Sequence, residues 1–121
     1  MSELEDTAIS EYSSLRPTEF HDLIRFELKR EWDEELDDTV TLEIDLAPTD
    51  KRRNCFLRLR FTGVIKLEYT PGYWSFCYID VRKIEEKWQE TCYRAFETEQ
   101  DTDFLLVCRK FKAQLVLPED V

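Results

Sequence analysis

Hydrophobic and polar residues alternate along most of this 121-residue chain. A period of two is typical of β-strands, in which successive side chains point to opposite faces of a sheet. The best turn lies at 70–73, where Pro71 presets φ and Gly72 accepts the positive φ of a type II turn. Residues 83–89 instead have a charge pattern that predicts one or two helical turns. The predicted strands lie at 20–28, 40–46, 55–61, 65–69, 77–81, 93–97 and 104–117. Gly63 predicts a bend or bulge, so 55–61 and 65–69 are either two short strands or one long bent strand.

Short connections, with no room for repeated crossover helices, predict antiparallel pairing of these strands. The expected fold class is mainly β, with α+β as the alternative. We expect an antiparallel curved sheet, a sandwich or a partly open barrel of six to seven strands, with one or two short helices. Residues 104–108 are apolar on both faces, so this strand is expected in the middle of the sheet. Its apolar phase changes around Arg109 and Lys110.

The length is that of an ordinary single domain, so we predict one domain over residues 1–121. Residues 1–18 form an acidic N-terminal extension, in which apolar residues have helical spacing up to Pro17. The chain begins without the basic and apolar regions of a signal peptide. Its longest apolar run, at 104–108, is far shorter than the roughly 20 residues of a membrane span. We therefore expect a cytoplasmic protein with no membrane partner.

The net charge of −10 is unevenly distributed along the chain. Residues 1–50 hold 16 acidic and 4 basic residues, whereas residues 51–121 hold 11 acidic and 13 basic residues. Six of the acids lie among the eight residues 31–38, which are too polar to be buried and predict a solvated hairpin loop. This segment lacks the alternating ligands and the glycine of an EF-hand, so no metal site is predicted.

The sequence carries no signature of catalysis or of cofactor binding. Glycine-rich phosphate loops are excluded because the chain has two Gly in total. The four cysteines include no CxxC pair, which favours buried free thiols over zinc ligands. His21 is the single histidine, and Asp22 is poorly placed to orient it, since adjacent strand residues point to opposite faces. We predict no catalytic residue and no cofactor; a small enzyme that uses His21 is an alternative.

Basic residues at 51–53, continued by Arg58 and Arg60, are the nearest approach to a nucleic-acid surface. A net charge of −10 opposes contact with phosphates, so no nucleic-acid partner is expected. We expect Arg58 and Arg60 instead to form cross-strand ion pairs with Glu43 and Asp45 on a neighbouring strand.

Aromatic residues beside the acidic segment and beside the predicted turn point to a protein-binding surface. Trp and Tyr are frequent at interface hot spots, and acids around them steer a basic partner toward the surface. The alternative is that these rings cover the ends of the core. The predicted partner-binding residues are Trp32, Asp33, Glu34, Glu35, Asp37, Asp38, Tyr73 and Trp74.

Several short segments, taken in chain order, carry a resemblance to a class of known proteins. They are Phe20-His21-Asp22, the turn at 61–64, the strand at 79–81, Trp88, and 93–97 leading into 104–112. In these segments the chain resembles small β-rich bacterial proteins, some of which are similar to the immunity proteins encoded beside polymorphic toxins. The resemblance implies a cytoplasmic β-rich domain without a catalytic centre and with a protein target.

Two further hypotheses concern partners. In the first, the chain is a non-enzymatic protein-binding module with an acidic surface, an immunity-type inhibitor of a basic partner. In the second, it is a self-associating structural protein, a homodimer in which strands such as 40–46 or 104–117 pair across a two-fold axis.

Overall fold

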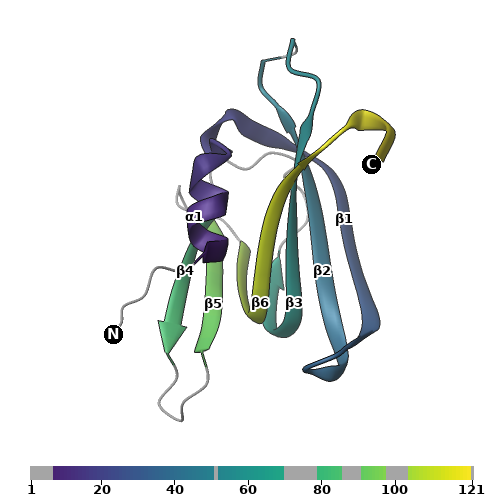
Figure 1. Cartoon of the computed structure of the whole chain (residues 1–121), viewed down its shortest axis with the longest axis vertical. Helices are drawn as coiled ribbons and strands as arrows, with labels where there is room; N and C mark the ends of the chain where they lie inside the picture. The colour runs from purple at the N-terminus through teal and green to yellow at the C-terminus, as the bar shows by residue number, and fades with distance from the viewer. Residues whose placement is uncertain (1–6, 51, 70–78, 86–90, 98–103, 121) are drawn as a thin grey trace.

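The computed structural model of the chain describes residues 7–50, 52–69, 79–85, 91–97 and 104–120. The elements in this part of the chain are α1 (Thr7–Ser14), η1 (Pro17–Glu19), β1 (Phe20–Asp33), β2 (Asp37–Pro48), β3 (Phe56–Tyr69), β4 (Ile79–Glu85), β5 (Thr91–Glu97), β6 (Phe104–Val116) and η2 (Pro118–Asp120). Neighbouring strands pair antiparallel in the order β1-β2-β3-β6-β5-β4. The predicted fold class, a mainly β curved antiparallel sheet with a short helix, is confirmed as one open sheet (Figure 1).

The sheet wraps around its own core because β3 and β6 bend in mid-strand (Figure 1). At the bend Gly63 has a φ of +74°, and the pairing of β3 with β6 shifts register just after it. Phe26 of β1 pairs with Ile44 of β2, which in turn pairs with Leu59 of β3. The ring of Phe26 nevertheless stacks on Tyr69, at the far end of β3, with centroids 4.7 Å apart. A straight strand would separate Leu59 from Tyr69 by about 33 Å. The contact therefore requires the bend.

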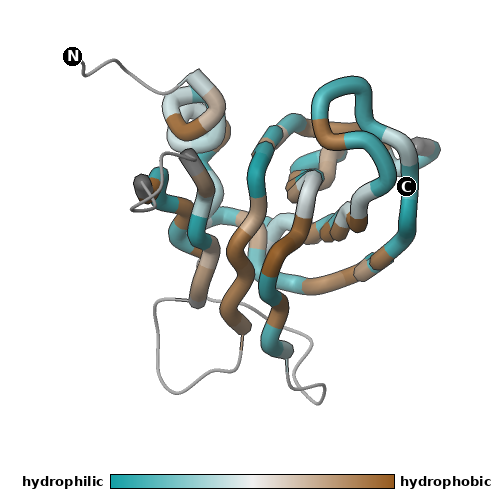
Figure 2. Tube along the Cα trace, turned by 90° about the horizontal axis from the view of Figure 1, so that it is seen from below, coloured by the Kyte–Doolittle hydropathy of each residue, from teal (hydrophilic) through white to brown (hydrophobic). Residues whose placement is uncertain are grey.

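Side chains that face inward on the strands form the core. Hydrophobic and hydrophilic positions alternate along the strands (Figure 2), as a period of two requires. Phe61 of β3 stacks on Phe111 of β6 with ring centroids 5.2 Å apart. The hydrophobic residues of β2 and β3 that are fully or almost fully buried are Leu42, Ile44, Leu46, Leu57, Leu59 and Phe61.

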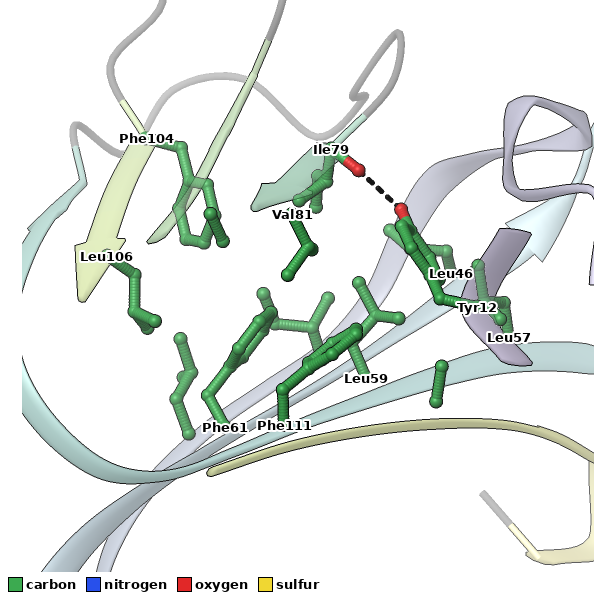
Figure 3. Packing of buried hydrophobic residues seen from close by; sticks show 14 of the residues in the cluster. Tyr12, Leu46, Leu57, Leu59, Phe61, Ile79, Val81, Phe104, Leu106 and Phe111 are labelled. Carbon is green, nitrogen blue, oxygen red and sulfur yellow. Dashed lines mark hydrogen bonds between the residues drawn. The ribbon is translucent and has the colours of Figure 1, made fainter. Parts of the chain in front are cut away.

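Tyr12 connects α1 to two strands of the sheet. Its ring meets the ring of Phe111 edge-on, with centroids 5.4 Å apart. Its hydroxyl donates a hydrogen bond to the carbonyl oxygen of Ile79 in β4 (Figure 3). The predicted N-terminal helix is thus confirmed over Thr7–Ser14 and belongs to the core; residues 1–6 lie outside the described residues.

The inward face of β1 differs from the prediction at one point. Ile24, Phe26 and Leu28 occupy alternate positions, so a regular strand would place all three on the same inner face. A bulge between Leu23 and Arg25 adds one residue and shifts the phase of the alternation. As a result Leu23 is buried and Ile24 is exposed, while Phe26 packs against the core as expected. Leu28 lies on an uncovered part of the strand and is also exposed.

The structure decides two further points. Of the two alternatives for 55–69, one long strand bent at Gly63 is confirmed as β3. Helical turns at 83–89 were a wrong prediction for the described residues 83–85, which belong to β4 because Lys83 and Ile84 pair with Tyr93 and Cys92 of β5. The predicted turn at 70–73 lies outside the described residues.

The strands proposed to pair across a two-fold axis are interior strands. β2 lies between β1 and β3, and β6 lies between β3 and β5, which agrees with the central position predicted for 104–108. The backbone groups of β2 over 41–46 and of β6 over 105–108 pair on both sides within the chain, so these parts of the two strands were a wrong choice for pairing with a second copy. Beyond residue 108, β6 pairs with β3 alone among the described strands, and pairing through that part stays a prediction. The edges of the sheet are β1 and β4.

We expect Gly63→Ala to lower the free energy of unfolding by roughly 1–3 kcal/mol, because any side chain is strained at this positive φ. The added methyl carbon would also lie 2.6 Å from Cδ1 of Leu36. Urea denaturation measures the change. In a Leu36→Ala background the cost should be smaller, and what remains is the backbone strain together with the contact to Arg109, whose Cβ and Cγ would lie 3.0 Å away. An unchanged unfolding free energy in Gly63→Ala would contradict this account of the bend.

Candidate functional site

The acidic segment forms a tight hairpin turn. β1 ends at Asp33 and β2 begins at Asp37, which adopts a positive φ of 65°. One oxygen of the Asp33 carboxylate, Oδ2, accepts the backbone N–H groups of Glu35 and Leu36 at 3.0 and 3.1 Å. The predicted hairpin is confirmed, but its connection is shorter than the predicted 31–38 loop because both strands extend into the acidic run.

The turn is fixed to the bend of β3 and β6. Lys110 of β6 places its Nζ 3.0 Å from Oδ2 of Asp33 and 2.6 Å from Oε1 of Glu35. The hydrogen bond from Lys110 lowers the pKa of Asp33, which keeps this carboxyl ionised. Leu36 lies against Gly63, where no side chain separates it from the backbone of β3. Two contacts across the sheet therefore hold the turn in place.

The structure brings six of the predicted partner-binding residues to this hairpin. Asp33 is used internally, and Trp32 precedes it with its side chain 71% exposed. Asp38 forms an exposed ion pair with Arg30. The remaining two predicted residues, Tyr73 and Trp74, lie outside the described residues. Four exposed carboxylates, which we call the acidic tip, surround the turn: Glu34, Glu35, Asp37 and Asp38.

A second group of charged residues covers the outer face of β1, β2 and β3. At its centre Asp45 of β2 is 0% exposed. Arg58 of β3 donates to its two oxygens at 2.8 and 3.0 Å, and Arg25 of β1 donates from Nε at 2.8 Å. The expected pairing of Arg58 with Asp45 is confirmed. Arg25 also binds Asp45, which the alternation of the sequence did not reveal, because the bulge in β1 sets the register that places Arg25 opposite Asp45.

This group continues along the sheet. Glu43 accepts from Arg25 and, at 2.8 Å, from Arg60. Arg60 also binds Glu31, which accepts the hydroxyl of Thr41 at 2.7 Å. The expected pair of Arg60 and Glu43 is confirmed. We call Arg25, Glu31, Glu43, Asp45, Arg58 and Arg60 the ion-pair network.

The ion-pair network holds its acids in the charged form. Burial by itself raises the pKa of Asp45, but hydrogen bonds from Arg58 and Arg25 outweigh it and hold the pKa below its usual value. Burial opposes ionisation of Glu43 as well, and hydrogen bonds from Arg25 and Arg60 again lower the pKa. Buried charge in this network is therefore compensated within the chain.

The hollows found in the described part of the chain are not typical ligand sites. One, of about 70 Å³, lies beside the ion-pair network, and is far below the roughly 300–1,000 Å³ of usual small-molecule pockets. It is lined by Glu43, Arg58, Arg60, Lys112 and Gln114. The other, of about 450 Å³, is a wide depression lined by Ser13 and residues 16–19 alone. It is formed by one turn of the chain rather than by converging elements.

His21 makes a local contact at the start of β1. Its Nε2 lies 2.6 Å from the carbonyl oxygen of Thr18 in the preceding turn. Because a carbonyl oxygen can only accept, Nε2 donates this hydrogen bond. Cys55, Cys92 and Cys108 are free thiols, and burial raises the pKa of Cys108; Cys77 lies outside the described residues. Within those residues, no cluster of three His, Cys, Asp or Glu side chains has the geometry of a metal site.

No family model, curated protein or solved structure matches this chain. None of the described helices is long and apolar enough to cross a membrane.

We expect Asp45→Ala to lower the free energy of unfolding by about 3–5 kcal/mol, because it leaves two half-buried guanidinium groups without their shared carboxylate. Chemical denaturation measures the loss. Glu68→Ala is the matched control, since Glu68 forms an exposed ion pair with Lys66 on β3 and its removal should leave the unfolding midpoint almost unchanged. Equal midpoints for the two variants would contradict a structural role for Asp45.

The lowered pKa values of Asp45 and Glu43 also predict a dependence of stability on pH. A carboxyl whose pKa is lower in the folded state than in the unfolded state stabilises the fold fully at pH values above its unfolded pKa of about 4. This contribution is lost as the pH falls from there through the pKa of the folded state. The free energy of unfolding should therefore fall below about pH 4. The fall should be smaller in Asp45→Asn, which has no carboxylate to protonate at this position. Urea titrations at several pH values test this, and equal slopes would contradict it.

Proposed function

We propose that this chain is a non-enzymatic protein-binding module that presents the acidic tip to a basic protein partner, in the manner of an immunity-type inhibitor. The observation that supports it is a turn whose four carboxylates are exposed while its backbone is fixed by Asp33, Lys110 and Leu36. Exposed charge on a fixed scaffold suits recognition of a partner rather than a chemical step.

The position of the other acids supports the same proposal. Glu31, Glu43 and Asp45 are neutralised by arginines of the ion-pair network, so their charge is not offered to a partner. In the acidic tip, Lys110 meets Glu35 and Arg30 meets Asp38, while Glu34 and Asp37 have no ion pair with another described residue. Negative charge is thus concentrated at one end of the β1–β2 hairpin.

A fixed acidic tip affects both the rate and the strength of binding. A surface of one charge accelerates association with an oppositely charged partner by 10- to 1000-fold at low ionic strength, an order-of-magnitude range. A turn that is already ordered loses little conformational entropy when it binds. The partner chemistry that fits is a basic protein surface, and binding should weaken as salt screens the charges.

The test is capture of proteins from the native cell on the immobilised chain, washed at low and at high salt. We expect a basic protein that is retained at low salt and released at high salt. The variant Glu34→Gln/Glu35→Gln/Asp37→Asn/Asp38→Asn should lose it, and Asn at position 37 tolerates the positive φ.

The matched control removes the same number of charges elsewhere. Glu11→Gln/Asp22→Asn/Glu68→Gln/Glu119→Gln changes four exposed acids distant in sequence from the acidic tip, and should retain the partner. Equal loss in both variants would show that total charge, and not the acidic tip, determines binding. Capture of no basic protein by the unmodified chain would refute the proposal.

A further inference from the structure

The outer edge of β1 is open along a long strand. β1 runs over 14 residues at one end of the sheet, and within the described residues only β2 pairs with it. A long edge strand carries unpaired backbone N–H and C=O groups that accept another strand. Charges on such an edge normally prevent pairing with a second copy, so their arrangement decides whether self-pairing is blocked or favoured.

We propose that a second copy of this chain pairs antiparallel with β1 across a two-fold axis that lies between the two copies of Leu28. The strand is regular over 25–33, where its pairing with β2 continues without a shift. Residues opposite each other in an antiparallel pair lie on the same face, so the two-fold axis must lie between the two copies of one residue. The chemistry of the segment selects which one.

With the axis at Leu28, opposed charges have opposite signs. Glu27 of each copy lies opposite Lys29 of the other, and Arg25 lies opposite Glu31. An axis at residue 27 or 29 would instead place Glu27 or Lys29 opposite its own copy, which is repulsive. Among axes at residues 27, 28 and 29, the sequence of the edge is therefore complementary to itself only with the axis at Leu28.

On the face of the segment opposite to the ion-pair network, the side chains of the two copies are also complementary in this register. Leu28, 51% exposed in the single chain, lies opposite its own copy at the axis. Phe26 lies opposite Arg30, a pairing of an aromatic ring with a guanidinium that is favourable. Trp32 at one end of the segment and Ile24, in the bulge at the other end, are also exposed. Apolar groups that the single chain leaves in water are thus gathered along the shared edge.

Glu27 and Lys29 are the charges that remain most available for the second copy. On the face of the ion-pair network their side chains are the most exposed of the matched segment, at 47% and 41%. Within the chain Glu27 meets Arg25 at 2.6 Å and Lys29 lies 4.0 Å from Glu31, whereas Arg25 and Glu31 also bind further members of the ion-pair network. By symmetry each contact between Glu27 and Lys29 occurs twice. This inference is independent of the proposed function, because the acidic tip lies beyond the matched segment 25–31.

Sedimentation velocity of the full chain over a range of concentrations is the test. We expect a dimer that dissociates on dilution, since seven residues per copy is fewer than the roughly 20–30 of a standard interface. Glu27→Lys or Lys29→Glu alone should weaken the dimer at least tenfold, an order-of-magnitude expectation, because each places like charges opposite each other twice. The double exchange Glu27→Lys/Lys29→Glu should restore it.

Controls separate this effect from loss of folding and from the proposed function. The exchange Lys66→Glu/Glu68→Lys, at an exposed pair on β3, should leave the dimer unchanged, as should the four-acid variant of the acidic tip. Urea midpoints establish that each variant is folded. A chain that is monomeric at its highest soluble concentration, or a dimer unaffected by either single reversal in a folded variant, would overturn the proposal.

Discussion

The bend shared by β3 and β6 is the constraint on which the rest of the structure depends. A single open sheet can bury a core only if it folds toward itself, and the contact of Phe26 with Tyr69 shows that it does so. Gly63 supplies the backbone conformation at the bend, and the adjacent register shift lets β6 follow β3. Tyr12 then links α1 to both β6 and β4, which holds the two halves of the sheet around the core.

The same bend positions the charged surface. Leu36 reaches the backbone of Gly63, and Lys110, beside the bend in β6, binds Asp33 and Glu35. On the outer face, Asp45 is buried at the cost of desolvation, which guanidinium groups from both neighbouring strands offset. A slip of one residue in either strand would turn these groups to the other face. Internal pairing thus neutralises the middle of the sheet and leaves negative charge at one end.

One hairpin therefore carries two surfaces of different chemistry. The outer edge of β1 alternates charges of both signs with exposed apolar groups, which is the basis of the proposed pairing with a second copy. The charged residues of the turn beyond it are all acidic, which is the basis of the proposed binding to a basic protein.

The local pattern of the sequence by itself determined the strands, the hairpin at the acidic run and the short N-terminal helix. It also determined the pairing of Arg58 and Arg60 with Asp45 and Glu43. A period of two and adjacent complementary charges are properties of neighbouring residues, so the sequence alone reveals them. Three features did not follow from the local pattern. They are the bulge that buries Leu23 in place of Ile24, the continuation of β4 through Lys83, and the contact of Lys110 with Asp33. Each depends on which strands become neighbours and in what register. Tertiary structure decided these features, since a bulge or a contact between residues 77 positions apart is stabilised only by packing that distant segments supply together.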